Sequence, residues 1–146
     1  MQKKGKPSVV FDSVVWVSIF LRKAGLTAEL FTLCLEKTKL FTAEEILKET
    51  RRVLLEKEHI RNKYAYHDAE VERFIELIRE QCAVVSELPD LRVIVRDPKD
   101  DMVIACAVVA QADYIVSRDH DLLDLETYQG IQIVIPETFI QYLRTL

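Results

Sequence analysis

The sequence predicts an α/β fold with three layers, α/β/α, in which helices cover both faces of a central parallel sheet of about five strands. Short apolar runs, such as residues 8–11 and 114–116, are typical of parallel strands buried on both faces. Longer segments between them repeat their apolar residues at helical spacing, and this alternation implies right-handed crossovers between parallel strands. With 146 residues and no linker or repeat, the chain is expected to form a single domain over residues 1–146, with its core at about 8–140.

The first half of the chain alternates strand and helix patterns. An apolar run ends at Asp12, and two segments with helical spacing follow, separated by Gly25. A later helix carries its apolar residues on one stripe, which is typical of a helix with one buried face. The expected elements are a strand at 8–11, helices at 14–22 and 27–36, a strand at 40–41 and a helix at 43–56.

The second half repeats this alternation. One helix, opened by Pro98, is apolar on nearly every side after its first turn and should therefore be buried rather than amphipathic. Pro136 stops the last strand, and a terminal helical segment follows it. The expected elements are a helix at 71–78, a strand at 83–85, a helix at 98–112, strands at 114–116 and 131–135, and a helix at 139–143.

Composition favours an ordinary cytoplasmic protein. Hydrophobic residues make up 49% of the chain and charged residues 30%, which excludes a disordered or collagen-like protein. The N-terminus lacks the apolar region of a signal peptide, and no stretch approaches the roughly 18 apolar residues of a membrane span. Cys34, Cys82 and Cys106 are widely separated in apolar runs, which predicts reduced core thiols rather than disulfides.

The net charge of −4 is unevenly distributed. Residues 97–126 contain eight acids and two bases, a local charge of −6, so the remainder of the chain carries +2. Arg51 and Arg52 belong to a basic cluster in the middle of the chain, where they could contact phosphates. The alternative explanation, a solvated helix face, is somewhat favoured.

Two aspartates are expected to meet at one edge of the sheet. Asp12 and Asp119 each follow an apolar strand, and the carboxyl ends of parallel strands share an edge. If the strands are neighbours, their backbones lie about 4.8 Å apart. Two carboxylates that close repel by about 4 kcal/mol at an effective dielectric near 20, unless a cation lies between them. The pattern therefore predicts a site for Mg²⁺ or Mn²⁺, which prefer oxygen ligands and support phosphodiester hydrolysis.

Further acids come from two helices. Asp97 is interpreted as the cap of the helix that Pro98 opens, and Asp100 could serve the same turn. Asp101 begins an otherwise apolar helix, so a third capping acid there is hard to justify, and a ligand role is favoured. On the middle helix, Glu49 borders the apolar stripe and is the glutamate best placed to reach a crevice, although such a residue is more often merely solvated.

The order of the candidate acids along the chain, with one after the first strand, one on the middle helix, one opening the late helix and one after the next strand, resembles that of the PIN-domain family. The resemblance runs from about residue 8 to 140 and rests on four motifs. They are Phe11-Asp12-Ser13-Val14-Val15-Trp16-Val17-Ser18, Thr42-Ala43-Glu44-Glu45-Ile46-Leu47-Lys48-Glu49, Asp101-Met102-Val103-Ile104-Ala105 and Ile115-Val116-Ser117-Arg118-Asp119.

The resemblance implies a ribonuclease in which four acids hold one or two Mg²⁺ or Mn²⁺ ions and RNA is cleaved to leave a 5′ phosphate. Those acids are Asp12, Glu49, Asp101 and Asp119. Ser117 would orient the last acid, and the other supporting residues are Ser13, Asp100 and Asp121. Arg51, Arg52 and Arg118 are weaker candidates for RNA contact. Many small stand-alone members are toxins of toxin-antitoxin pairs, so the resemblance also implies a homodimer and an antitoxin protein that covers the site.

One departure from the family pattern favours an alternative. Val14 stands where family members commonly carry Asn, which would reduce activity unless Ser13 compensates. The chain would then be a catalytically weakened module that binds RNA or protein, although all four acids are retained. In a second alternative, a phosphotransfer domain, Asp12 would be the nucleophile. The sequence lacks the second aspartate two residues later and the lysine after a late strand that this chemistry needs.

Overall fold

A computed structural model describes residues 5–94 and 97–146 of the chain. Its centre is a six-stranded sheet in the order β3-β2-β1-β4-β6-β5, in which every neighbouring pair is parallel except β5 and β6. The strands are β1 (Ser8–Phe11), β2 (Lys39–Ala43), β3 (Ala83–Val85), β4 (Tyr114–Val116), β5 (Thr127–Tyr128) and β6 (Ile131–Val134). The predicted α/β class with a central parallel sheet is confirmed.

The sheet has one strand more than expected. The additional strand, β5, contains two residues and pairs antiparallel with β6 at the edge of the sheet. The chain turns between them at Gln129 and Gly130, both with positive φ. A two-residue strand is too short to show a hydrophobic period, which is why the sequence pattern did not indicate it.

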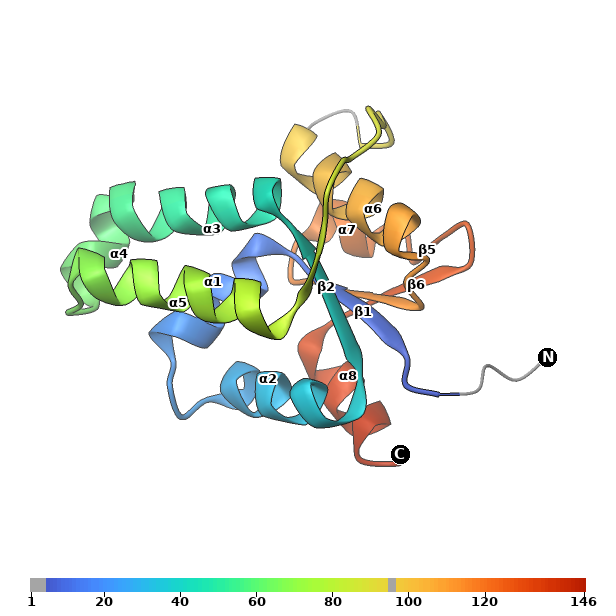
Figure 1. The fold of residues 1–146 in the computed structure, drawn as a ribbon, viewed down its shortest axis with the longest axis horizontal. Helices are drawn as coiled ribbons and strands as arrows, with labels where there is room; N and C mark the ends of the chain where they lie inside the picture. The colour runs from blue at the N-terminus through green and yellow to red at the C-terminus, as the bar shows by residue number, and fades with distance from the viewer. Residues whose placement is uncertain (1–4, 95–96) are drawn as a thin grey trace.

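Eight helices connect the strands in the part of the chain that the structure describes. They are α1 (Ser13–Leu21), α2 (Leu26–Lys37), α3 (Glu44–Glu56), α4 (Glu58–Lys63), α5 (Asp68–Gln81), α6 (Pro98–Ala110), α7 (His120–Leu123) and α8 (Pro136–Leu143). Figure 1 shows α6 on one side of the sheet and α2 and α8 packed together on the other. The two helices missing from the sequence analysis, α4 and α7, span six and four residues, too few for a reliable helical period.

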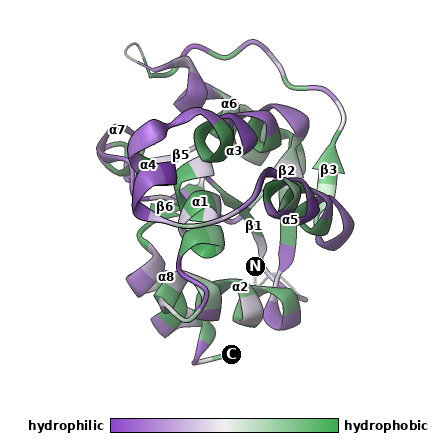
Figure 2. Cartoon of the chain, turned by 90° about the vertical axis from the view of Figure 1, so that its left-hand side faces the viewer, coloured by the Kyte–Doolittle hydropathy of each residue, from purple (hydrophilic) through white to green (hydrophobic). Residues whose placement is uncertain are grey.

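The buried core lies between the sheet and these helices. Trp16 on α1 is fully buried, and its ring packs 4.9 Å from that of Phe11 and 5.3 Å from that of Phe31, between ring centroids. Figure 2 shows the matching difference in hydropathy, since the residues of α1 are largely hydrophobic whereas those of α4, none of which is buried, are hydrophilic. The expectation of a buried α6 is confirmed, because residues 103–107 are all buried.

The three cysteines are buried and free, as predicted. Burial raises the pKa of each thiol to about 12, so none is a reactive thiolate near neutral pH. Within the described residues, no helix has both the length and the apolar composition needed to span a bilayer.

The strand order fixes where a site can form. From β1 the chain moves outward to β2 and then β3, and α6 carries it back across the sheet to β4, on the other side of β1. The order therefore reverses between β1 and β4. In open parallel sheets a crevice opens at the carboxyl ends of the strands at such a point.

Candidate active site

Asp12 and Ser117 follow the paired ends of β1 and β4, where Phe11 lies opposite Val116. The Asp12 amide donates to the carbonyl of Val116 at 3.2 Å, which continues the ladder. The Asp12 side chain is buried, and its Oδ1 accepts a hydrogen bond from the amide of Val15 at 2.8 Å, so it also caps α1. Its Oδ2 accepts a hydrogen bond from the hydroxyl of Ser117. Both oxygens are thus held in place.

Asp119 is held by the same serine. Its amide donates to Ser117 Oγ at 2.9 Å, and its own Oδ1 accepts from the amide of Asp121 at 2.8 Å, which caps α7. Ser117 was expected to orient the last acid, and it contacts both that residue's backbone and the carboxylate of the first acid. Asp121 contributes its backbone amide to the site.

The first turn of α6 completes the group of acids. One oxygen each from Asp97, Asp100 and Asp119 lie within 4.8 Å of one another. Asp100 is buried, and its Oδ2 has no hydrogen-bond partner among the described residues. A buried carboxylate oxygen without a donor is costly, so this atom indicates a place for a ligand.

Burial and mutual repulsion perturb these carboxyls. The pKa of Asp100 rises to about 8, first because the group is desolvated, then because the charges of Asp119 and Asp97 lie nearby. Burial also raises the pKa of Asp12, to about 6, against hydrogen bonds from Ser117 and Val15 that lower it. The charge of Asp119 raises it further. Crowded, desolvated oxygens of this kind fit a hard divalent cation such as Mg²⁺ or Mn²⁺.

Asp101, the favoured ligand on α6, lies outside this group. Its Oδ1 accepts hydrogen bonds from the amides of Val93 at 2.9 Å and Ile94 at 2.7 Å, and it therefore ties the segment after β3 to α6. Consecutive helical residues point about 100° apart, so Asp100 and Asp101 face different surroundings. In the group of acids with Asp97 and Asp119, the residue from this turn of α6 is Asp100 and not the expected Asp101. The spacing of Asp97 and Asp100 could have shown this, because residues three apart share one side of a helix.

Glu49, the acid expected from the middle helix, faces two cations. Its side chain is 12% exposed, and its Oε1 lies 2.6 Å from an Nη of Arg52 and 3.3 Å from the Nζ of Lys99. Glu49 therefore borders the core, but it is not one of the three acids whose oxygens gather within 4.8 Å. Ser13 lines a small cavity with Glu49 and Lys99, directly after Asp12 in the chain.

The arginines named as candidates for RNA contact all have acidic partners. Arg51 forms an ion pair with Glu72, and Arg118 forms one with Glu137. Arg52 pairs with Glu49 beside the site. The charges of Arg51 and Arg118 are therefore each balanced by one glutamate.

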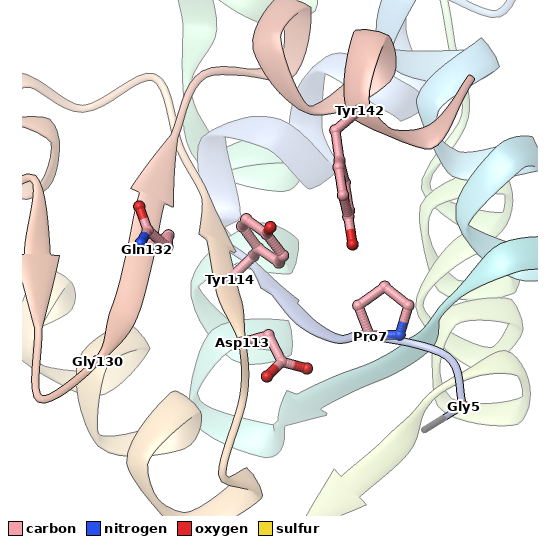
Figure 3. A pocket seen from close by; sticks show the side chains of 7 residues that line it. All are labelled: Gly5, Pro7, Asp113, Tyr114, Gly130, Gln132 and Tyr142. Atoms are coloured by element: carbon pink, nitrogen blue, oxygen red, sulfur yellow. The ribbon is translucent and has the colours of Figure 1, made fainter. Parts of the chain in front are cut away.

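A separate pocket of about 370 Å³ lies at the opposite edge of the sheet, shown in Figure 3. Asp113 precedes β4 there, and its Oδ2 accepts a hydrogen bond from the amide of Ser8 at 2.9 Å. The rings of Tyr114 and Tyr142 lie 5.2 Å apart between centroids in its wall. Because it opens at the amino ends of β1 and β4, this pocket does not contribute to the acid group.

Comparison with known proteins identifies the family. A sequence model of the PIN domain matches residues 8–121, a range that contains Asp12, Glu49, Asp119 and the acids at the start of α6. The chain belongs to the PIN-domain family. Membership indicates a nuclease-type function, and the aspartate group is compatible with the divalent metal that PIN domains bind.

A solved structure agrees with this PIN fold. The crystal structure of PAE2754 from Pyrobaculum aerophilum is similar with a TM-score of 0.58 and 16% sequence identity, over 98% of this chain and 94% of that one. At this identity the likeness supports the fold alone. The sequence has no significant match among curated proteins.

Proposed function

We propose that this PIN domain is a metal-dependent endoribonuclease that hydrolyses phosphodiester bonds of RNA. The observation that carries the proposal is the convergence of acids from three separate segments: Asp12 after β1, Asp100 on α6 and Asp119 after β4. One buried oxygen of Asp100 has no hydrogen-bond partner among the described residues. Such an arrangement is unfavourable for the protein alone and is explained by a bound cation.

In this proposal Asp12, Asp100 and Asp119, with Asp97 beside them, would hold Mg²⁺ or Mn²⁺. When bound, such an ion lowers the pKa of water and stabilises negative charge on phosphoryl oxygens. The chain's own residues keep the ligands in position. Ser117 joins the first and last acids, while the amides of Val15 and Asp121 fix the rotation of the Asp12 and Asp119 carboxylates. Rigid ligands of this kind need no reorganisation when the cation and substrate bind.

The biological part of the proposal follows from the motifs that resemble small stand-alone family members. The protein would act in the cytoplasm as the toxin of a type II toxin-antitoxin pair, form a homodimer and be silenced by an antitoxin protein. A short gene for a DNA-binding protein beside this one, and a dimer in sedimentation analysis, are the expected findings. A monomer with no such neighbouring gene would contradict this part while leaving the chemistry intact.

A second candidate, a weakened RNA- or protein-binding module, is favoured by one observation. Val14 follows Asp12 by two residues, where family members commonly carry Asn, and its side chain is 48% exposed. It therefore presents a hydrocarbon surface at a position where an amide would offer hydrogen bonds.

Cleavage of a mixed pool of 5′-labelled single-stranded RNA distinguishes the two candidates. We expect the wild type to cut in Mn²⁺ or Mg²⁺, to leave 5′ phosphates and to stop in a chelator. Asp12→Asn and Asp119→Asn should abolish cutting without unfolding the protein. The matched control is Asp124→Asn, which alters an exposed acid directly after α7. Full cleavage by either site variant would overturn the proposal, and RNA binding without cleavage by the wild type would support the second candidate.

A further inference from the structure

The pocket at the amino ends of the strands is formed where three strands begin and the last helix ends. Pro7, Asp113 and Gly130 directly precede β1, β4 and β6, and Tyr142 lies in the last turn of α8. The pocket volume of about 370 Å³ falls at the lower end of the range for small-molecule sites, roughly 300–1,000 Å³. Because the acid group lies at the carboxyl ends of β1 and β4, a ligand in this pocket would leave those acids accessible.

The charge of the pocket comes from Asp113, which is the charged residue among the lining residues that the structure describes. Lys6 is exposed and is not one of them. The amide of Ser8 donates to Asp113 Oδ2 at 2.9 Å and holds the carboxylate in place. Figure 3 shows this carboxylate pointing toward Pro7, on the same side as the hydroxyl end of Tyr142. A carboxylate can accept about four hydrogen bonds, so acceptor positions remain for a ligand.

Two tyrosine rings form one wall of the pocket. The centroids of the Tyr114 and Tyr142 rings lie 5.2 Å apart, and the two planes are inclined by 39°. Phe139 supports the wall from α8, with its ring centroid 5.0 Å from that of Tyr114. The pKa of Tyr114 is raised first by burial, then by Tyr142, and then by the charge of Asp113, so this charge reaches the aromatic wall.

A cation fits this lining better than an anion. The amides of Ser8, Asp113 and Gln132 all donate to acceptors of the chain, the last two to the Ser8 and Asp113 carbonyls at 2.8 and 3.0 Å. An anion would therefore meet the Asp113 charge without a donor from these three amides. An ammonium group gains from both parts of the lining, because it donates to a carboxylate and is attracted to the face of an aromatic ring within about 6 Å.

We propose that this pocket is a second binding site, separate from the acid group, and that it takes an alkylammonium group, either from a free diamine or from a lysine side chain of a partner protein. Asp113 accepts the ammonium N–H groups, while Tyr114 and Tyr142 contact the charge and the methylene groups next to it. The inference does not depend on the proposed ribonuclease function, because it uses none of the acids assigned to the metal. The competing explanation is a solvated surface hollow without a ligand.

An NMR titration of the full isotope-labelled chain separates these explanations. The probes are 1,4-diaminobutane and the Nα-acetyl methylamide of lysine, and the matched neutral ligand is the same lysine derivative acetylated at Nε. Excess Mg²⁺ is present, since the acid group would otherwise also attract ammonium groups. We expect saturable shifts at the backbone amides of Tyr114, Gly130 and Gln132, and binding about tenfold weaker or less for the neutral ligand, which lacks the charge-assisted hydrogen bond.

Variants of the pocket test its two parts separately. Asp113→Asn removes the charge but keeps an oxygen to accept from the Ser8 amide, and it should weaken binding of both charged probes about tenfold. Tyr142→Leu should weaken binding about threefold, whereas Tyr142→Phe should keep most of the affinity because the ring remains. The matched control is Asp90→Asn, an acid whose side chain is 84% exposed outside the pocket, and its affinity should be unchanged.

The outcomes also distinguish the two sources of the ammonium group. Binding of the lysine derivative alone supports a partner protein, and tighter binding of the diamine supports a free amine, provided that Asp113→Asn weakens either one. The absence of saturable shifts at the pocket amides, or shifts that persist unchanged in Asp113→Asn, would overturn the proposal. If Asp113→Asn failed to fold, the wild type would still decide, because equal affinities for the lysine derivative and its Nε-acetylated form exclude a site for the charge.

Discussion

The hydroxyl of Ser117 donates a hydrogen bond to the buried carboxylate of Asp12, 105 positions away in the sequence. The contact exists because β1 and β4 pair in parallel and end together, with Phe11 opposite Val116. The same hydroxyl oxygen accepts from the amide of Asp119 at 2.9 Å. One side chain thus sets the spacing of two acids that come from different strands.

Ser117→Ala should therefore destabilise the protein by about 1–3 kcal/mol, because it leaves a buried carboxylate and a backbone amide without a partner. It should also raise the pKa of Asp12 above its value of about 6, since the Ser117 hydrogen bond is the largest influence that lowers it. Urea denaturation at pH 7 measures the first effect. Ser86→Ala, at an exposed position, is the control, and equal unfolding midpoints for the two variants would contradict the assigned role.

Asp100 should make the metal-free protein less stable as the pH rises. Its pKa is about 8 in the folded state against an ordinary 3.8, so the folded protein holds this proton more tightly than the unfolded chain. The resulting stabilisation is complete below about pH 4 and is lost as the pH rises through about 8. Asp12, with a pKa raised to about 6, contributes with the same sign.

Asp100→Asn removes this loss, so in a chelator its melting temperature should exceed that of the wild type at pH 8 and approach it near pH 4. Thermal melts across this pH range, with Asp124→Asn as the control, measure the difference. A wild type whose stability increases from pH 5 to pH 8 in chelator would show that the acids are not crowded as described.

Much of the sheet could be predicted because strands and their ends are local properties of the sequence. An apolar run that stops at an aspartate identifies the end of β1 before any packing is known, and the run before Ser117 does the same for β4. The resulting expectation, that Asp12 and Asp119 meet at one edge, needs only parallel neighbouring strands.

The choice between Asp100 and Asp101 could not be made in this way. Both open the same helix, and their assignment depends on how α6 is rotated about its axis over the sheet, which tertiary packing decides. The partners of Asp101 lie in the segment before α6, at Val93 and Ile94, where the sequence shows no periodic pattern. Glu49 was similarly ambiguous, because Lys99 reaches it from 50 positions away in the chain.

Mn²⁺ should raise the melting temperature of the wild type and have little effect on an Asp100→Ala, Asp119→Ala double variant. An ion that binds only the folded state and is present at 100 times its Kd adds about 2.7 kcal/mol to the free energy of unfolding. Asp101→Ala is the informative comparison. It should melt at a lower temperature without metal, because two amides lose their acceptor, yet keep the full Mn²⁺ effect. Loss of that effect in Asp101→Ala alone would return Asp101 to the ligand set.

Val14→Asn should increase the rate of RNA cleavage without destabilising the fold. Val14 lies in the first turn of α1, two residues after Asp12, and its side chain is 48% exposed, so its replacement removes little buried surface. The change in unfolding free energy should stay within about 0.5 kcal/mol, as is usual for exposed positions. An amide at this position would add hydrogen-bonding groups beside the acids, which the valine cannot supply.

Val14→Ala serves as the control, because it shortens the same side chain without adding an amide. Single-turnover cleavage in Mn²⁺ should therefore be faster for Val14→Asn than for both Val14→Ala and the wild type. Equal rates for all three proteins would show that valine in place of the family's usual Asn does not limit the rate of cleavage.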